Sequence, residues 1–473
     1  MSELPSVSIL IVNYNGQHLL AECLDAVFEL QYPKSKYEVI VIDNDSKDNS
    51  VSFVSKNYPQ VKIVESPINS GFTGGNNLGF AASTGEYIVL LNTDTRVERS
   101  WLSELVRAAE PKTVGIVSSK LLFDVPFVEL TIEANCIPKS SIENSIDFSP
   151  IGILLEDIQC SRDDHTALVW YESGFYEKKI SNIATRWTRG TGIVLLPFQD
   201  SQRESYRIAM HGYPTEKKLQ TPVVLKVGGK VVGEVQLASN EAKQFDLTLT
   251  RKQVEHLLEY RVQNAGNVLL SDGFSKDRGS IVRIANNEHV EFYEKDSAHF
   301  EQPAQLLAAC GASCLIKRSV IDHIGFLDGN FFMYYEDIDF SFRTWKMGWD
   351  IVFAPKARVF HKHKATTGKG ETIFFLHMVE KNHLYFVLTH YPVWVVLSEV
   401  STFFARLAVT VLKFNIFRFR DNIVRTNIWK IKAKGRVLAA SFFIRHVGQL
   451  FKNRIFLRRH QKRGYAEAQQ YIY

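Results

Sequence analysis

An aspartate that follows a short apolar run is the first residue whose type and position suggest chemistry. Residues 87–91 read YIVLL, and the next four read NTDT, with Asn92 first and Asp94 third. The run is typical of a buried strand, and ligands of open α/β sheets bind beyond the carboxyl ends of the strands. A carboxylate there suits a divalent cation, Mg²⁺ or Mn²⁺, that holds the phosphates of a ligand. The alternative is that Asp94 caps the helix expected near residue 100.

A glycine- and asparagine-rich stretch precedes this strand. Residues 69–77 read NSGFTGGNN, which we interpret as a loop that lets the backbone approach a ligand closely. It is not a Walker A sequence, because no Gly-Lys-Ser/Thr follows. The residues that we expect to line a diphosphate and a ribose are Asn69, Gly71, Gly74, Gly75, Asn76 and Asn77.

A second acid, Asp43, follows the apolar run at residues 37–42, YEVIVI. A carboxylate at the end of a strand can accept hydrogen bonds from a ribose or from the N–H of a base. The surrounding sequence DNDSKDNS also favours an Asx turn, in which Asp43 bonds to its own backbone. Both roles can hold at once.

Acids that could serve as a general base lie in the sequence YYEDIDF. On a helix, Asp339 and Arg343 are four residues apart and are expected to form an ion pair. Asp337 lies on a different face and is the freer carboxylate, so it is the candidate base. The alternative is an acidic helix start that is solvated and favoured by the helix dipole, although the flanking aromatic residues argue against simple solvation.

A histidine, His361, ends the next apolar run in VFHKH. Most single histidines are structural or solvated. One that arrives near an aspartate-bound metal would be a further ligand.

The elements that position these residues alternate between strand and helix. Strands are expected at 7–13, 37–42, 61–65, 87–91 and 114–122, and helices at 47–57, 71–82 and 100–109 as well as after Gly16. This alternation predicts βαβ units and a mostly parallel sheet. It returns near residue 306, where a helix over 335–347 is expected to stop at Gly348.

Between these parts the pattern changes to short alternating β runs. The clearest covers 223–237, two strands around Gly228 and Gly229, a pair that favours a hairpin turn. We therefore divide the chain into a nucleotide-binding half at 1–124, an inserted β-rich region at 125–260, a second half at 261–390 and a C-terminal region at 391–473.

Composition is that of a folded protein. The 473 residues are 45% hydrophobic and 23% charged, which excludes a disordered chain. Five cysteines form no CxxC pair, which favours a reducing compartment. The N-terminus lacks the basic segment of a signal peptide, so we expect the chain to start in the cytoplasm.

The C-terminal region is unusually basic. Residues 413–463 hold fifteen Lys or Arg and one Asp, a net charge of +14 where the whole chain has +5. Residues 391–412 read as an amphipathic helix, with Glu399 and Arg406 disfavouring a membrane span. We expect this region to lie on an anionic membrane surface. The alternative is a core-packed helix with a solvated tail, and nucleic acid ranks third because no binding motif accompanies the charge.

The motifs together resemble the family 2 glycosyltransferases of GT-A fold, a nucleotide-diphospho-sugar transferase fold with a Rossmann-like mixed sheet. The resemblance rests on the order VSILIVNYNG, VIDNDSKDNS, NSGFTGGNNLGF, GEYIVLLNTDT, GFLDGNFFMYYEDIDFSFRTWKMGW and PKARVFHKH. It extends to QNAGNVLLSDGFSKDRG at 263–279 and EKNHLYFVLTHYP at 380–392. It is closest to bacterial rhamnosyltransferase-like members, and it covers neither the β insertion nor the basic tail.

The resemblance implies an inverting transferase that uses a nucleotide-diphosphate sugar and a divalent cation. By position, Asp337 is the base, Asp94 and His361 are metal ligands, and Asp43 contacts the nucleoside. The residues expected to bind the donor are Asn13, Asp43, Asn69, Gly71, Gly75, Asn76, Asn77 and Asn92. The acceptor implied is a glycan or a polyprenyl-linked glycan in cell-surface polysaccharide synthesis, at the inner face of the cell membrane.

The chain departs from the family at two places. Asn92 stands where many relatives have Asp, and Lys381, Asn382 and His383 stand where relatives often carry a more arginine-rich sequence. The rhamnosyltransferase-like members share the Asn, so we keep catalysis as the main hypothesis. The alternative is a non-catalytic protein that binds a glycan or a partner on a decayed transferase fold.

Overall fold

The computed structural model describes residues 3–138, 149–161, 168–175, 179–180, 184–199, 202–212, 219–285, 288–362, 372–419 and 423–472. The chain forms two compact units. The first contains residues 1–124, 263–279 and 297–473, and the second contains residues 125–262 and 280–296. Residues 280–296 thus belong with the second unit, a division that the predicted boundaries do not anticipate.

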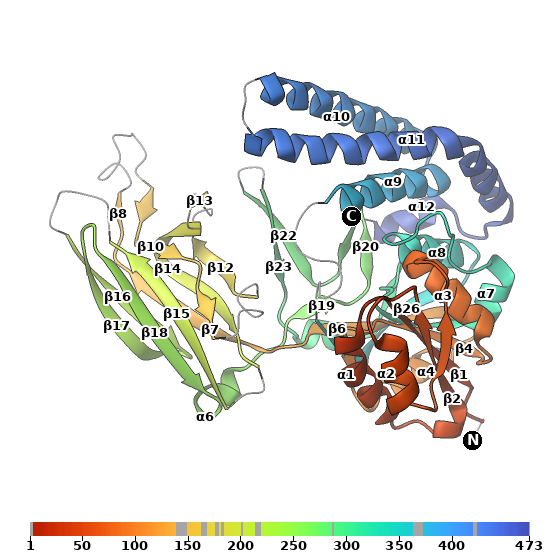
Figure 1. Ribbon diagram of the computed structural model, residues 1–473, viewed down its shortest axis with the longest axis horizontal. Helices are drawn as coiled ribbons and strands as arrows, with labels where there is room; N and C mark the ends of the chain where they lie inside the picture. The colour runs from red at the N-terminus through yellow and green to blue at the C-terminus, as the bar shows by residue number, and fades with distance from the viewer. Residues whose placement is uncertain are drawn as a thin grey trace. The chain divides into compact units, whose positions relative to one another are not determined.

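A mixed sheet forms the centre of the first unit (Figure 1). Four apolar runs pair in parallel in the order β3-β2-β1-β4, and β25 then runs antiparallel between β4 and β6. The prediction of a mostly parallel sheet is confirmed for its N-terminal part. The strands are β1 (Val7–Asn13), β2 (Tyr37–Asp43), β3 (Lys62–Glu65), β4 (Tyr87–Leu91), β5 (Thr95–Val97), β6 (Val114–Phe123), β19 (Val262–Asn264), β24 (Ala304–Leu306), β25 (Ser313–Lys317) and β26 (Asp350–His361).

Helices cover this sheet because their apolar faces bury against it. The bounds are α1 (Gln17–Phe28), α2 (Ser50–Asn57), α3 (Gly71–Ala82), α4 (Trp101–Ala108), α7 (Arg318–Ile324) and α8 (Glu336–Lys346), with one-turn 3₁₀ helices at Lys34–Lys36 and Ala298–Glu301. As predicted, α8 ends before Gly348, whose φ of 98° suits glycine.

Two predictions overlap here: the helix over residues 71–82 is confirmed, because α3 spans Gly71–Ala82, and the loop over residues 69–77 therefore ends before Gly71. The glycines let α3 lie close to the sheet. A Cβ on Gly75 would come within 2.7 Å of Val12 Cγ1, and one on Gly79 within 2.6 Å of Ile42 Cδ1. These glycines therefore allow α3 to pack closely on β1 and β2.

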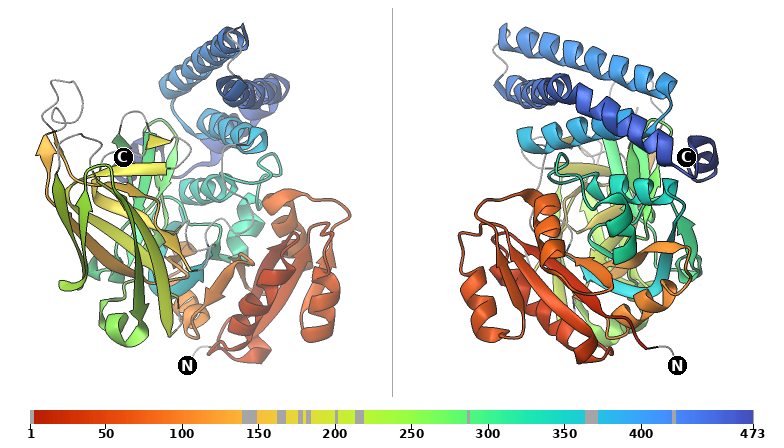
Figure 2. Two further views of the ribbon diagram at one scale, coloured as in Figure 1. Left: turned by 60° about the vertical axis from the view of Figure 1, so that its left-hand side comes forward. Right: turned by 90° about the vertical axis from the view of Figure 1, so that its right-hand side faces the viewer.

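Three long helices form a further layer of the first unit, α9 (Ile373–His390), α10 (Val393–Phe419) and α11 (Ile423–His460), followed by α12 (Tyr465–Ala468) and a 3₁₀ turn at Gln469–Tyr471. Figures 1 and 2 show α11 between α9 and α10, with α10 outermost. The basic stretch is not a solvated tail: α11 packs on α9, and Arg436 Nε donates to Glu380 Oε1 over 2.8 Å.

The second unit is antiparallel, with strand order β11-β15-β10-β14-β7-β16-β17. The predicted hairpin is confirmed: Gly228 and Gly229, with φ of 55° and 76°, join β16 (Gln220–Val227) to β17 (Lys230–Ala238). The remaining elements are β7 (Phe127–Ala134), β8 (Ile137–Pro138), β9 (Pro150–Ile151), β10 (Leu154–Glu156), β11 (Gln159–Cys160), β12 (Trp170–Phe175), β13 (Lys179–Ile180), β14 (Ala184–Pro197), β15 (Arg203–His211), β18 (Ala242–Thr250), α6 (Arg251–Val254), a 3₁₀ turn (Glu255–Leu257), β22 (Ser280–Ala285) and β23 (Glu288–Tyr293).

Candidate functional site

Asp94 and His361 meet at adjacent strand ends in the first unit. The strands β5 and β26 pair antiparallel, with His361 opposite Thr95, and the backbone N–H of Lys362 donates to the Asp94 carbonyl over 2.9 Å. His361 Nε2 lies 3.1 Å from Asp94 Oδ1, and both side chains are largely buried. The predicted metal ligands are thus direct neighbours, although 267 residues separate them in the chain.

The hydrogen bond of His361 Nδ1 determines whether His361 Nε2 is available to bind a metal ion. His361 Nδ1 lies 2.6 Å from Gln263 Oε1, so we assign the ring proton to Nδ1 from this hydrogen bond. In the neutral imidazole, Nε2 then presents a lone pair to the Asp94 carboxylate. Two facing acceptors fit a divalent cation between or beside them.

Few protein side chains are available to ligate such a cation. In the described ranges, no group of three or more His, Cys, Asp or Glu side chains gathers as a metal site. Mg²⁺ and Mn²⁺ commonly take only one or two protein ligands and complete their shell with water and phosphate oxygens. Asp94 and His361 fit that requirement. The alternative role of Asp94 as a helix cap is wrong, because β5 intervenes and Ser100 precedes α4.

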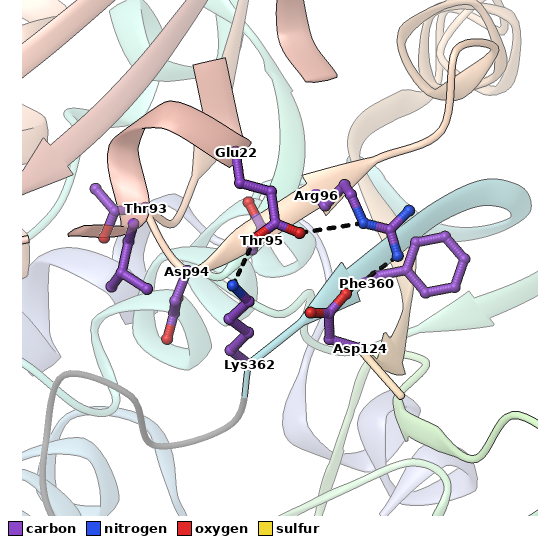
Figure 3. A pocket seen from close by; sticks show the side chains of 9 residues that line it. Glu22, Thr93, Asp94, Thr95, Arg96, Asp124, Phe360 and Lys362 are labelled. Atoms are coloured by element: carbon purple, nitrogen blue, oxygen red, sulfur yellow. Dashed lines mark hydrogen bonds and ion pairs between the residues drawn. The ribbon is translucent and has the colours of Figure 1, made fainter. Parts of the chain in front are cut away.

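A small pocket lies beside Asp94 (Figure 3). Its wall is a chain of ion pairs, in which Glu22 contacts Lys362 and Arg96, and Arg96 contacts Asp124 over 3.1 Å. The pocket has almost no room even for a water molecule, whereas typical small-molecule sites have roughly 300–1,000 Å³. It therefore adjoins the site and does not by itself hold a ligand as large as a nucleotide sugar.

Asp337, the predicted base, is half-buried at the first turn of α8. Its Oδ2 accepts hydrogen bonds from the Gly311 N–H (2.8 Å) and from Asn267 Nδ2 (3.3 Å), and its Oδ1 accepts one from the Ile338 N–H (2.8 Å). Burial raises the pKa of Asp337, and the Gly311 and Ile338 amides oppose that rise. A carboxylate held this way remains a proton acceptor with a raised affinity for the proton.

Asp339 behaves differently, as predicted. Arg343 Nε donates to its Oδ2 over 2.7 Å, and His390 Nε2 lies 2.8 Å from its Oδ1. Burial opposes ionisation, yet the Arg343 charge and the His390 hydrogen bond lower the pKa of Asp339 to about 2. Within the described residues Asp337 has no ion-pair partner of this kind. The two acids therefore have separate roles.

One backbone link brings Asp337 to the sheet end that carries Asp94. The strand β25 pairs with β4, and just beyond this pairing the Asn92 N–H donates to the Ala312 carbonyl over 3.0 Å. The preceding residue, Gly311, gives its N–H to Asp337. Asn92 and the candidate base are thus held by consecutive residues.

The segment before α8 is strained. Phe332, Tyr334 and Tyr335 adopt φ of 63°, 68° and 71°, a region that aromatic residues seldom occupy. Asn382, which is fully buried, donates through Nδ2 to the carbonyls of residues 331, 333 and 334 at 3.1, 2.8 and 2.7 Å. Sequence reasoning missed this role of Asn382, and no local signal reveals it.

Asn13 and Asp43 lie side by side at the ends of β1 and β2, both buried. Asn13 Nδ2 donates to Asp43 Oδ1 over 3.3 Å, and the Ser46 N–H donates to Asp43 Oδ2 over 3.0 Å. The Asp43 carboxylate thus bonds the backbone three residues ahead, and the Asx turn of this stretch forms instead at Asp48, whose Oδ1 accepts from the Ser50 N–H over 3.1 Å. A contact of either residue with a nucleoside stays a prediction.

The polar residues around α3 bind the protein itself. Asn69 Oδ1 accepts from Asn44 Nδ2 (3.0 Å), and Asn76 Nδ2 donates to the Phe72 carbonyl (2.9 Å). The amide of Asn77 bonds both the carbonyl and the N–H of Leu327. These contacts tie the start of α3 to both halves of the sheet.

Gly71 lies against the strained segment. A Cβ there would come within 2.4 Å of the Phe332 carbonyl oxygen, which itself accepts from the Thr73 N–H over 3.0 Å. The predicted roles of Asn69, Gly71, Gly75, Asn76 and Asn77 in donor binding stay predictions.

The residues that depart from the family pattern also have partners in the protein. Lys381 Nζ donates to the Asn330 carbonyl, and His383 Nε2 lies 2.9 Å from the Asp272 carbonyl while its ring stacks on Phe274 at 3.8 Å. Lys381 and Asn382 thus support the segment that leads into α8, and His383 contacts residues 272 and 274.

Comparison with known proteins gives matches over both halves of the first unit. Residues 8–130 match the family described as Glycosyl transferase family 2, and residues 264–413 match Glycosyl transferase family group 2. Glycosyltransferase AglE of Haloferax volcanii is 33% identical over 128 residues, 26% of this chain and 42% of that protein. A poly(ribitol-phosphate) beta-glucosyltransferase of Bacillus spizizenii is 36% identical over 92 residues, 19% of this chain and 14% of that protein.

The chain thus matches less than half the length of these relatives. Among solved structures, GalNAc-T7 with UDP, GalNAc and Mn²⁺ aligns over 87% of this chain and 51% of that chain, at 13% identity and a TM-score of 0.44. Staphylococcus aureus TarS 1–349 aligns over 24% of this chain and 35% of that chain, at 21% identity and a TM-score of 0.23. The family matches and the mixed sheet agree, and the chain therefore contains a family 2 glycosyltransferase domain of the GT-A fold, at residues 8–130 and 264–413.

Proposed function

We propose that this protein is an inverting glycosyltransferase that moves a hexose or rhamnose from a nucleotide-diphosphate donor to a glycan or lipid-linked acceptor. Asp337 accepts the proton of the acceptor hydroxyl as its oxygen bonds to the anomeric carbon. The bond between that carbon and the diphosphate oxygen breaks in the same step, and the nucleoside diphosphate leaves. Attack opposite the leaving group inverts the configuration.

A divalent cation, when bound, neutralises charge on the departing diphosphate. Asp94 and His361 are the residues that would hold it. Asn92 is neutral and adds no charge to this set, so the cation would depend on Asp94, His361 and the phosphates. Asn13, Asp43, Asn69, Gly71, Gly75, Asn76, Asn77 and Asn92 are proposed to contact the donor.

The observation that carries this proposal is the link at the end of β4. Asn92 bonds to the Ala312 carbonyl, and Gly311 bonds to the Asp337 carboxylate. The Asp94–His361 pair, which could bind a metal, and the half-buried Asp337 carboxylate, which has no ion-pair partner in the described chain, thereby lie near one end of the sheet, where α/β sheets bind ligands.

The names of two relatives support the proposed acceptor class. Two are poly(ribitol-phosphate) sugar transferases by name, from Bacillus spizizenii and Staphylococcus aureus. We propose a related class here, a cell-surface polymer or its lipid-linked precursor, at the cytoplasmic face of the cell membrane.

A donor panel tests the activity. Wild-type protein is assayed with UDP-, GDP- and dTDP-sugars, dTDP-rhamnose included, with Mn²⁺ or Mg²⁺, by release of nucleoside diphosphate and by product stereochemistry. Asp337→Asn should lower turnover by about 10²–10⁴-fold. Asp322→Asn, at an exposed position on α7, is the matched control and should retain full activity.

Two results would overturn the proposal. One is the absence of turnover with every donor. The other is an Asp337→Asn protein as active as wild type. Nucleotide binding without turnover or metal dependence would instead favour a non-catalytic binding protein.

Membrane attachment is supported by the outer face of α10. Its polar residues Glu399 and Thr410 are buried, whereas Arg406 is exposed, and Thr410 accepts a hydrogen bond from Arg436 of α11. Its large apolar residues instead face outward, namely Val393, Trp394, Leu397, Phe404, Val409, Val411, Leu412 and Ile416. An amphipathic helix that exposes its apolar side suits the boundary between lipid headgroups and acyl chains.

Exposed cations accompany this face on the neighbouring helix, including Lys430, Lys434, Arg445 and Lys452. Their charge complements an anionic lipid surface. α10 is also the one helix in the described part of the chain that is long and apolar enough to cross a membrane. We propose that it lies in the interface, with its buried side on α9 and α11.

Vesicle flotation tests this attachment. Wild type should float with vesicles that contain phosphatidylglycerol, and Leu397→Asp with Phe404→Asp should abolish flotation while leaving the fold intact. Val231→Asp, at an exposed apolar position of the second unit, is the matched control. Unchanged flotation of the double variant would contradict the proposal, and retention in the membrane after alkaline carbonate extraction would indicate a span instead.

A further inference from the structure

Residues 263–279 form a segment that the proposed mechanism does not use. They leave the second unit, form the strands β20 (Asn267–Leu269) and β21 (Ser275–Asp277) within the first unit, and lead back into the second unit. We refer to residues 263–279 as the hairpin segment. Two of its side chains contact residues of the candidate site.

The first contact is between Asn267 and the candidate base. Asn267 is 8% exposed, and its Nδ2 lies 3.3 Å from Asp337 Oδ2 and 3.0 Å from the Ala309 carbonyl. The backbone N–H of Asn267 also donates to the Ala308 carbonyl over 2.9 Å. The amide group is thus fixed from both the main chain and the side chain.

The orientation of this amide is determined by its neighbours. Asn264 Nδ2 donates to Asn267 Oδ1 over 2.9 Å and to Asp277 Oδ1 over 2.8 Å, while Asn264 Oδ1 accepts from the Gly266 N–H over 2.7 Å. Because the carbonyl of Asn267 faces a donor, its NH₂ group must face Asp337. The hairpin segment therefore presents a donor, not an acceptor, to the carboxylate.

The second contact is between Gln263 and the candidate metal ligand. Gln263 is 2% exposed, and its Oε1 lies 2.6 Å from His361 Nδ1. A partner on Nδ1 fixes both the ring orientation and the tautomer, and leaves Nε2 for Asp94 or a cation.

The geometry points to the hairpin segment as the positioning element of the active site. Asn267 orients the Asp337 carboxylate toward the acceptor, and Gln263 fixes the His361 ring. Only the kinetic test of this inference rests on the proposed function. The effects of both contacts can also be measured without turnover. Gln263 and Asn267 are positioning residues, not catalytic ones, since they act through Asp337 and His361.

A merely structural hairpin would affect stability and nothing else. A positioning role requires a change at the residue that is positioned. The other titratable groups near Asp337 are Glu336 and Asp339 of α8, Cys310 and Cys314 at the start of β25, and Asp277 of the hairpin segment. All of them remain in the variants below, so a changed Asp337 reports the loss of the Asn267 donor.

The kinetic test uses Asn267→Ala in the full-length protein. Misplacement of the base should lower kcat by about 10–10²-fold with little change in the KM for the donor. Because a hydrogen-bond donor favours the ionised carboxylate, its removal raises the pKa of Asp337 and moves the acid limb of the kcat profile to higher pH. Asn57→Ala, which removes a hydrogen bond to the Phe53 carbonyl at an exposed position of α2, is the control for both readouts.

A second measurement does not depend on turnover. The resonance of Asp337 in protein labelled with [γ-¹³C]aspartate is assigned by its loss in Asp337→Asn, and its titration midpoint is compared in wild type and Asn267→Ala. A rise of the midpoint is expected. An unchanged midpoint in a folded variant overturns the role of Asn267, whether or not the protein transfers sugar.

Mn²⁺ alone is the probe for Gln263. The affinity of wild type and Gln263→Ala for Mn²⁺ is measured by electron paramagnetic resonance, with Gln305→Ala, an exposed position on β24, as the control. Loss of the partner on Nδ1 should weaken binding by about 10–100-fold. Equal affinities, or no binding by wild type, would overturn the role of Gln263.

Discussion

The two sides of the candidate site are held in different ways. On one side, Asp94 and His361 lie at the ends of regular strands, and no non-glycine residue of 92–97 or 350–362 has a positive φ. On the other side, Asp337 follows a segment with three aromatic residues in the left-handed region. On the first side, strand pairing positions the functional residues. On the second side, other residues hold a strained backbone segment in place.

This difference indicates where each side is vulnerable. A backbone of β strands keeps its shape when one side chain is replaced. Substitutions at Asp94 should therefore change the rate of the reaction and leave the structure intact. Left-handed conformations of non-glycine residues require of the order of 1–3 kcal/mol each. Substitutions around the segment 331–335 should therefore also change the local backbone conformation and the free energy of unfolding.

After the loss expected for Asp337→Asn, the largest effect is expected on the strand-built side. Asp94→Asn removes the only formal negative charge from the pair with His361, and charge stabilisation of this kind is typically worth about 10²–10³-fold in kcat. Initial rates at increasing MnCl₂ should show both this loss and a weaker dependence on Mn²⁺, with an unchanged unfolding temperature. An undiminished response to Mn²⁺ would remove Asp94 from the metal site.

The next effect is expected on the strained side. Asn382→Ala removes an NH₂ group whose two hydrogens are shared among three carbonyls of the segment 331–335. At roughly 0.5–1.5 kcal/mol for each of two hydrogen bonds, their loss should destabilise the first unit by about 1–3 kcal/mol. Urea unfolding gives this value, and hydrogen exchange should rise first at amides 331–338.

Asn427→Ala, at an exposed position of α11, is the control for Asn382→Ala and should leave both measurements unchanged. Uniform exchange across the first unit, without local opening at 331–338, would show that Asn382 supports the whole unit and not the strained segment.

The same contrast explains what the sequence could predict. Apolar runs and their order predict β1, β2, β4 and the placement of Asp94 at a strand end, because strand burial is a local property. The Asp339–Arg343 ion pair follows from helical spacing alone. The approach of His361 to Asp94 was expected only through the family resemblance.

The rest depends on contacts between distant parts of the chain. Gln263, Asn267 and Asn382 each act through a partner between 49 and 98 residues away, and no local pattern distinguishes them from other polar residues. The close packing of Gly75 in α3 on Val12 could not be predicted for a related reason: packing partners are not visible in the sequence.

Lowering the pH is expected to reduce the free energy of unfolding by an intermediate amount, through Asp339 of α8. The Arg343 charge and the His390 hydrogen bond hold the pKa of Asp339 at about 2 despite burial. The unfolded chain takes up a proton near pH 4, whereas the folded one does so only near pH 2. Stability from this group is thus present above pH 4 and lost as the pH falls toward 2, by about 2 kcal/mol.

Burial also lowers the pKa of His390, to about 4, so the unfolded state gains a further proton between about pH 6.5 and 4. Urea midpoints from pH 7 to pH 3 should therefore fall throughout. Asp339→Asn separates the two groups, because it removes the decline below pH 4. A flat profile between pH 4 and 3 in wild type would contradict the Asp339 assignment.

The smallest effect is expected at the wall of the pocket beside Asp94. Glu22 is 39% exposed and pairs with Lys362 and Arg96, and exposed pairs contribute roughly 0.2–1 kcal/mol. Asp94 does not depend on Glu22, because His361 holds its carboxylate and the Lys362 N–H holds its carbonyl. Glu22→Gln should therefore lower the unfolding temperature slightly, less so at high salt, and leave the Mn²⁺ dependence unchanged. A loss as large as that of Asp94→Asn would mean that surface charge, not strand register, fixes this side of the site.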